Sequence, residues 1–307
     1  MCLLRSAVLC VAVFASIALP IGVCAAEHIV VASKIDTEGA LLGNLIAQLL
    51  RRHGFEIENR IQLGPTKIVR EAILAGQIDV YPEYTGNGAQ FFHLESDPAW
   101  KDARRGYEKV RDLDLARNRL VWLEPAPVDN TWAIALNRQF AQTARLKSLD
   151  DFARYINSGG RIRLAASAEF VESPSALPTF EATYGFHLRD DQLLTLSGGD
   201  TSATNRIAAE RVSGVDAAMA YTTDGSIHAL GLVLLADDRG AQTVYAPSVV
   251  IRQSVLERSP AIREILAPAF ASLTQSALQT LNARIAVDGE DAEAVAKSYL
   301  EAQGLLR

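Results

Sequence analysis

Aromatic and charged residues gather in four short segments of the sequence, at places where predicted strands or connections end. The segments are Ala32–Gly39 (ASKIDTEG), Tyr81–Gly88 (YPEYTGNG), Val128–Trp132 (VDNTW) and Ala220–Gly225 (AYTTDG), and Tyr245 stands apart. Such residues recognise small ligands without covalent chemistry, because ring faces attract cations and charged groups attract their opposites. Open parallel sheets bind ligands beyond the carboxyl ends of their strands. The arrangement therefore predicts one cleft that these segments face.

Each of these residues also has an ordinary structural explanation. A tyrosine at the end of a strand commonly packs half-buried against its neighbours. Lys34 could be a solvated loop charge, and Trp132 could belong to a hydrophobic core. These alternatives stay open on the residues alone.

The motifs of the common enzyme classes are missing from the sequence. It contains no H-E-x-x-H, G-x-S-x-G or Walker A sequence and no G-x-G-x-x-G after the first predicted strand, and its five histidines are scattered. We therefore predict no enzyme activity, no cofactor and no metal site. A secreted enzyme with a carboxylate pair, Glu83 with Asp36 or Asp224, is the open alternative from another class.

Residues 1–26 have the three-part layout of a secretory signal. Arg5 precedes an apolar run over residues 7–19, which is well short of the ~20 residues of a membrane-spanning helix. Small residues follow this run, so we expect cleavage after Ala25 or Ala26 and export to the periplasm.

Removal of this signal would leave an acidic chain without cysteine. Cys2, Cys10 and Cys24 all lie within it, so the remainder forms no disulfide. Lipid anchoring through Cys24 is an alternative to simple export. The formal net charge of −6 for all 307 residues becomes −7 once Arg5 is removed. An acidic chain has no general attraction to nucleic acid, which we exclude as a partner.

Strands and helices alternate along the first hundred residues after the signal. Residues 28–33 form a β-branched run typical of a buried strand, and a helix with leucines on one face follows and ends near Gly54. A strand over 56–63, a helix beginning at Thr66 and a strand over 78–81 complete the unit. This order is typical of a parallel sheet with helices on its faces.

A second unit of the same kind begins after two prolines near residue 126. It starts with a strand over 131–136, continues with a helix capped by Ser148, and ends with a strand over 217–221. From Pro260 the chain is mostly helical, and we expect it to return to the first unit. The predicted fold class is therefore α/β with two lobes.

We predict the following boundaries for these lobes. The first lobe takes residues 27–126 and 246–307, the second takes 131–236, and the hinge lies near 127–130 and 237–245.

Four stretches of the sequence resemble one family of transport proteins. VVASKIDTEG, GPTKIVREAILAGQIDVYPEYTGNG, AAMAYTTDG and the C-terminal LNARIAVDGEDAEAVAKSYLEAQGLL are similar to substrate-binding proteins of osmoprotectant ABC importers. These are the glycine betaine, carnitine and choline binders of the OpuAC-type family, in the branch of the ProX- and OsmF-like proteins. The similarity runs over nearly the whole chain after residue 26.

The resemblance implies a type II-like periplasmic-binding fold that closes on its ligand about two hinge crossings. It implies an aromatic cage for a quaternary ammonium group, together with polar groups for a carboxylate. The implied cage residues are Tyr84, Trp132, Tyr221 and Tyr245. It also implies a monomer that delivers a small ligand to a membrane permease.

The same resemblance implies polar contacts for the other end of the ligand. Lys34 would be the carboxylate partner, helped by the loop around Asn87, and Asn130 would add a backbone or amide contact. One departure lies in EFVESPSALP, where Ser173 stands near the place of an arginine in many relatives. Loss of a charge-assisted bond costs ~1.5–3 kcal/mol. Choline, weak binding, or another zwitterion or amino acid such as proline are therefore open alternatives, and a ligand sensor is a further one.

Overall fold

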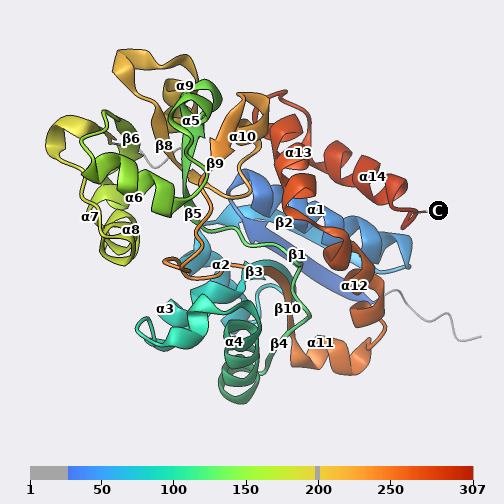
Figure 1. Cartoon of the computed structure of the whole chain (residues 1–307). Coiled ribbons are helices and arrows are strands. Elements are labelled where there is room, and N and C mark those ends of the chain that lie inside the picture. Colours follow the sequence, from blue (N-terminus) through green and yellow to red (C-terminus); the bar gives the residue numbers. More distant parts are fainter. Residues whose placement is uncertain (1–26, 198–200, 307) are drawn as a thin grey trace, which may run out of the picture.

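The computed structural model describes residues 27–197 and 201–306, and it contains two separate five-stranded sheets (Figure 1). The predicted signal over residues 1–26, including Cys24, lies outside the described residues. The first sheet has the order β2-β1-β3-β10-β4 and the second has the order β7-β6-β8-β5-β9. We call each sheet with its helices the first lobe and the second lobe.

The strands of each sheet are short and come from distinct parts of the chain. The first sheet contains β1 (His28–Lys34), β2 (Glu56–Gly64), β3 (Val80–Tyr84), β4 (Leu120–Trp122) and β10 (Pro247–Arg252). The second contains β5 (Trp132–Asn137), β6 (Leu164–Ser167), β7 (Leu193–Leu196), β8 (Ala217–Tyr221) and β9 (Leu232–Leu234).

One strand in each sheet runs against the other four. β1 pairs in parallel with β2 and β3, whereas β10 is antiparallel to both β3 and β4. In the second sheet β6 is parallel to β7 and β8, and β5 is antiparallel to β8 and β9. The predicted α/β class with mainly parallel sheets is therefore confirmed, with one reversed strand in each lobe.

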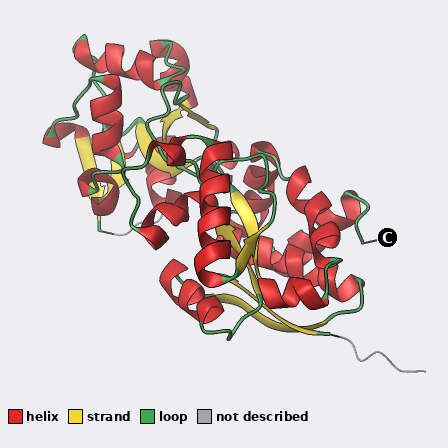
Figure 2. Cartoon of the chain, turned by 90° about the horizontal axis from the view of Figure 1, so that it is seen from below, coloured by secondary structure: helices red, strands yellow, loops and turns green. Residues whose placement is uncertain are grey.

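Helices cover both faces of the sheets (Figure 2). The first lobe has α1 (Thr37–Arg52), α2 (Thr66–Leu74), α3 (Gly88–Phe92), α4 (Ala103–Asn118), α11 (Gln253–Arg258), α12 (Ile262–Ser272), α13 (Gln275–Ala286) and α14 (Ala292–Ala302). The second lobe has α5 (Arg138–Ala144), α6 (Leu149–Asn157), α7 (Ala168–Glu172), α8 (Leu177–Tyr184), α9 (Thr201–Glu210) and α10 (Gly225–Ala229). No helix of the described ranges is long and apolar enough to cross a membrane.

The buried helix α1 organises the core of the first lobe. Asp36 caps it by accepting a hydrogen bond from the Gly39 backbone N–H at 2.7 Å, and Gly54 follows its end with a φ of 87°. Its apolar face, including Leu41 and Leu45, is fully buried. Helices α12, α13 and α14 pack against α1.

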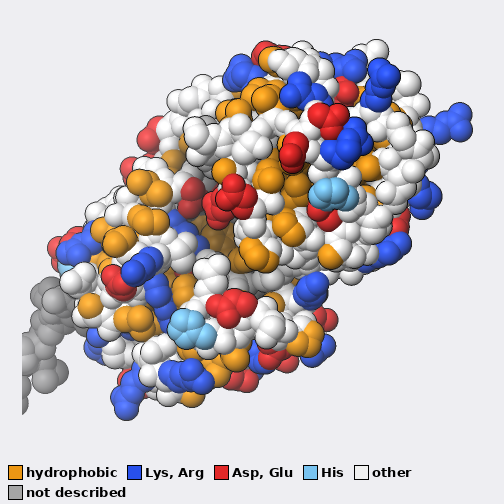
Figure 3. Space-filling view, turned by 90° about the vertical axis from the view of Figure 1, so that its left-hand side faces the viewer, with side chains coloured by type: hydrophobic (Ala, Val, Ile, Leu, Met, Phe, Trp, Pro, Cys, Tyr) orange, Lys and Arg blue, Asp and Glu red, His pale blue; other side chains and the backbone are white. Residues whose placement is uncertain are grey.

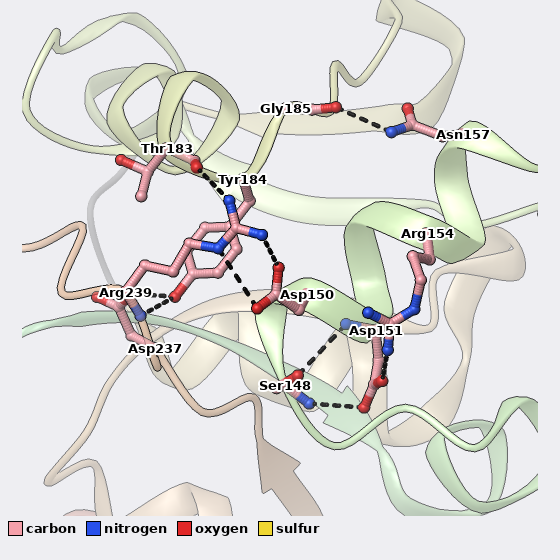
Figure 4. A network of polar contacts seen from close by, with 10 residues as sticks. All are labelled: Ser148, Asp150, Asp151, Arg154, Asn157, Thr183, Tyr184, Gly185, Asp237 and Arg239. Carbon is pink, nitrogen blue, oxygen red and sulfur yellow. Dashed lines mark hydrogen bonds and ion pairs between the residues drawn. The ribbon is translucent and has the colours of Figure 1, made fainter.

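Polar contacts fix the second lobe around the start of α6 (Figure 4). Ser148 is the N-cap that the sequence predicts, and it forms a capping box with Asp151. Asp237 accepts hydrogen bonds from the Tyr184 hydroxyl at 2.5 Å and from the Ala241 N–H at 2.9 Å. Arg239 pairs with Asp150. The chain that leaves the second lobe is therefore held against α6 and α8.

Two chain segments join the lobes and bond to each other. One connects β4 to β5, and the other connects β9 to β10. The Asn130 N–H donates to the Tyr245 carbonyl at 3.0 Å, and the Thr131 hydroxyl donates to the Thr243 carbonyl at 2.8 Å. The two connections are therefore bonded to each other where they pass between the lobes.

Helix α10 of the second lobe also packs against α13 of the first lobe. A Cβ atom placed on Gly225 would lie 2.1 Å from the backbone nitrogen of Ala283. Gln279 donates to the Thr222 carbonyl at 2.7 Å, and Asn282 donates to the Thr223 carbonyl at 3.0 Å. This backbone approach is a third point of contact between the lobes.

Candidate functional site

A cavity of about 590 Å³ lies between the lobes, and all seven predicted site residues line it. Figure 3 shows a hollow with orange hydrophobic side chains in its wall and red carboxylates beside it. The residues come from both lobes and from the connections between them: Lys34, Tyr84, Asn87, Asn130, Trp132, Tyr221 and Tyr245. The structure therefore brings these seven residues together, as one cleft requires.

Trp132 and Tyr221 form an aromatic wall on the second lobe. They are cross-strand partners at the ends of β5 and β8, and their rings stack with centroids 4.2 Å apart and an interplanar angle of 22°. Phe170 meets the Trp132 ring edge-on at 5.3 Å. Each stacked ring has one face covered by the other, so the pair presents outer faces to a ligand.

Tyr84 lies at the end of β3 and is held from two sides. Its hydroxyl donates to Glu38 Oε1 at 2.7 Å, and Lys34 Nζ lies 4.5 Å from its ring centroid. The side chain is largely buried. One face of this ring therefore already carries a cation of the protein itself.

Lys34 and Asn87, the expected carboxylate partners, both bind Glu83. Lys34 Nζ lies 2.5 Å from Glu83 Oε1, and Asn87 Nδ2 donates to the same oxygen at 2.7 Å. Glu83 is fully buried and also accepts the Tyr84 N–H at 2.7 Å. The charge of Lys34 is therefore balanced inside the protein before any ligand arrives.

Glu38 is a buried carboxylate at the cavity to which the sequence analysis gave no role. It accepts hydrogen bonds from Tyr84, from Asn130 Nδ2 at 3.0 Å and from Asn282 Nδ2 at 2.8 Å. No lysine or arginine of the described residues pairs with it, and burial raises its pKa. Glu38 thus ties α1, β3, a connection and α13 together beneath the cavity.

Ser173 lies away from the cavity, at the end of α7. Its hydroxyl shares a hydrogen bond with that of Ser175 at 3.0 Å. From the same short helix, Glu169 lines the cavity. The sequence indicated that Glu169 and Phe170, the EF of EFVESPSALP, lie near the site. It did not indicate which residue of this segment would face a ligand.

Tyr245 is positioned by Asp129, a half-buried carboxylate of the other connection. Its N–H donates to Asp129 Oδ1 at 2.7 Å. Burial raises the pKa of Asp129 to about 6, although the hydrogen bond from Tyr245 opposes the shift. The folded protein therefore binds a proton here at pH values where the unfolded chain has lost it.

This shift predicts that Asp129→Asn stabilises the protein at neutral pH. An unfolded aspartate titrates near 3.9, so the contribution of Asp129 to stability decreases as the pH rises from ~4 to ~6. Asparagine keeps an acceptor for the Tyr245 N–H without a charge to bury. We expect the free energy of unfolding in urea to rise by about 1–2 kcal/mol at pH 7 and to change little at pH 4. Asp238→Asn, at an exposed position of the other connection, is the control; an equal gain there would contradict the prediction.

No group of His, Cys, Asp or Glu residues suited to a metal ion occurs in residues 27–197 and 201–306. Among the described residues, the groups that line the cavity are ring faces, carboxylates, amides, hydroxyls and one paired lysine. This set is suited to noncovalent recognition of a small cation or zwitterion.

Comparison with known proteins identifies a family for the chain. Residues 27–302 match OpuAC, the substrate-binding domain of ABC-type glycine betaine transport systems. The chain is 54% identical to the glycine betaine-binding protein YehZ of Escherichia coli over 94% of each sequence. It is 30% identical to a glycine-betaine-binding protein of Pseudomonas aeruginosa over 99% of this chain and 96% of that one.

A solved structure gives the same result for the fold. Apo YehZ of Escherichia coli has a TM-score of 0.83 and 55% identity, and the match covers 91% of this chain and all of that one. The predicted resemblance and the two-lobed fold are confirmed by these comparisons. The chain belongs to the family of substrate-binding proteins of ABC-type glycine betaine transport systems.

Proposed function

We propose that this protein binds a quaternary ammonium osmoprotectant, such as glycine betaine or choline, in an aromatic cage between its lobes and delivers it to the permease of an ABC importer. The observation that carries this proposal is the convergence of four aromatic side chains on one interlobe cavity. Trp132 and Tyr221 come from the second lobe, Tyr84 from the first, and Tyr245 from a connection.

The chemistry of the ligand explains why rings are needed. A trimethylammonium group has no hydrogen to donate, so hydrogen bonds cannot recognise it. Aromatic faces attract such a cation with ~0.5–2 kcal/mol for each desolvated face. The outer faces of the Trp132–Tyr221 stack and the ring of Tyr245 supply such faces, and lobe closure would desolvate them.

The proposal includes how the lobes move and where the protein works. Residues 27–126 with 246–307 and residues 131–236 move as two bodies about the connections near 127–130 and 237–245. The protein acts as a monomer in the periplasm, exported by residues 1–26, and it binds and releases its ligand without chemical change. Membership of a substrate-binding family supports delivery rather than catalysis.

Removal of a cage wall provides the test. Calorimetry on residues 27–307 with glycine betaine, choline, carnitine and proline should show binding of a trimethylammonium compound. Trp132→Ala removes the outer ring face of Trp132 and leaves the Tyr221 ring without its stacking partner, and we expect it to weaken binding at least tenfold. Tyr84→Ala is expected to weaken binding as well, because it removes a wall and loosens Lys34.

Trp132→Phe is the matched control, because it keeps a ring face at the same position and should retain most of the affinity. Millimolar trimethylammonium compounds that all fail to bind the unmodified protein would overturn the ligand assignment. Binding of proline alone would favour the alternative of an amino-acid ligand on the same fold.

A further inference from the structure

The described residues place one cationic side chain at the cavity, and its charge is already balanced by a carboxylate of the protein. Lys34 is the one lysine or arginine among the described residues that line it. Its ammonium group lies 2.5 Å from the fully buried carboxylate of Glu83 and 4.5 Å from the centre of the Tyr84 ring. A ligand carboxylate would therefore have to share Lys34 with an anion that cannot move into solvent.

Carboxylates of the protein outnumber this lysine around the cavity. Asp36, Glu38, Glu169 and Asp224 all line it. Asp36 caps α1, Glu38 is bound by neutral donors, and Asp224 accepts the Tyr221 N–H at 2.9 Å. Even without Glu38, whose pKa is raised by burial, Asp36, Glu169 and Asp224 give the cavity a negative formal charge after the charges of Lys34 and Glu83 cancel.

Glu169 is exposed, and it differs from the other three because its side chain has no hydrogen bond or ion pair within residues 27–197 and 201–306. It stands in the first turn of α7, next to Phe170, which supports the Trp132 ring. The pKa of the Tyr221 hydroxyl is raised mainly by burial and next by the negative charge of Glu169. The carboxylate of Glu169 therefore interacts electrostatically with a residue of the aromatic wall. A cation against that wall would have Glu169 as a ready counter-ion.

We propose that the cavity selects a quaternary ammonium compound with a net positive charge and no carboxylate, such as choline, over a zwitterionic betaine, and that Glu169 is a residue that determines this preference. The inference rests on the proposed function, since it concerns the same cavity. The aromatic faces bind the trimethylammonium group of either ligand. The carboxylates favour the ligand whose other end carries no negative charge, and Lys34 offers no free charge to reverse that preference.

Calorimetry with choline, tetramethylammonium and glycine betaine tests this preference. We expect the unmodified protein to bind choline at least tenfold more tightly than glycine betaine. Glu169→Gln should lower the affinity for choline and tetramethylammonium about threefold to tenfold. It should leave the affinity for glycine betaine unchanged or raise it. Raising the salt concentration should lower the affinity for choline more than the affinity for glycine betaine.

Glu172→Gln is the matched control, because it removes the same charge from the same helix at an exposed position outside the cavity. It should leave all three affinities unchanged. Equal effects of Glu169→Gln and Glu172→Gln would show a general field effect and overturn the role of Glu169.

Further outcomes separate this inference from the function on which it rests. Tighter binding of glycine betaine than of choline, unaffected by Glu169→Gln, would overturn the preference and leave the proposed function standing. Failure of all three ligands to bind the unmodified protein would overturn both. Glu83→Gln provides an independent test, because it removes the carboxylate that balances the charge of Lys34. Glycine betaine should then gain affinity relative to choline. An unfolding curve checks that the variant is folded.

Discussion

Gly225→Ala is expected to weaken ligand binding by at least tenfold and to lower the free energy of unfolding by about 1–3 kcal/mol. The new Cβ atom would lie 2.1 Å from the nitrogen and 2.5 Å from the Cα of Ala283. Both atoms belong to the backbone of α13, so no side chain can rotate to make room. Helix α10 must therefore move away from α13.

That movement would change the cavity because the same contact positions its wall. Thr222 and Thr223 accept hydrogen bonds from Gln279 and Asn282, and Gly225 itself lines the cavity. Calorimetry measures the loss of ligand affinity, and urea unfolding measures the loss of stability. Gly106→Ala serves as the control, since its Cβ would meet a first neighbour at 3.3 Å in the interior of α4, far from the lobe contact. Unchanged affinity in Gly225→Ala would show that the contact between α10 and α13 does not shape the site.

Asp114→Ala is expected to destabilise the first lobe by about 3–5 kcal/mol, because it leaves a buried arginine without its partner. Arg70 binds both oxygens of Asp114, at 2.8 and 2.6 Å, and both residues are buried. Asp114 also accepts the Trp122 indole N–H and the Asn118 amide, each at 2.7 Å. One carboxylate thus satisfies donors from α2, α4 and β4.

Urea unfolding would measure this loss, and two further variants would explain it. Asp112→Ala, on the exposed side of the same helix, should cost well under 1 kcal/mol. Replacing the pair together, with Arg70→Met and Asp114→Leu, should recover much of the lost stability, since an apolar pair leaves no charge to bury. Equal stability of Asp114→Ala and the unmodified protein would mean that water reaches Arg70 once the carboxylate is gone.

The sequence predicted the parts of the fold that local signals encode. The strand predicted over residues 28–33, the leucine face of α1 and the cap at Ser148 each depend on residues close together in the chain, and all three are confirmed. Shorter elements were missed. α3, α7 and α10 have five residues each, too few for a helical period to appear. α4 was missed because its sequence is rich in charges and has few apolar residues.

The candidate site was predictable where its residues stand at the ends of strands or in the connections between the lobes. Tyr84 and Tyr221 were found because they follow apolar runs, and Trp132 because it begins one. Asn282 could not be found, since it reaches Glu38 across 244 positions of sequence from the middle of an ordinary helix. The pairing of Lys34 with Glu83 was hidden for the same reason, because a sequence does not show which charges the folded chain has already neutralised.

The position of β10 has a consequence for how the protein forms. Among the described strands, β4 has β10 as its neighbour in the sheet, and β10 also completes the edge of β3. The strands of the second lobe all lie between residues 132 and 234, so that lobe can assemble as soon as its own chain has emerged. Among the described strands, β3 stays unpaired on one side and β4 lacks its neighbour until residues 247–252 arrive. The lobe that begins the chain is therefore expected to fold last, and during synthesis its apolar strands are the part of the nascent chain that most needs protection from aggregation.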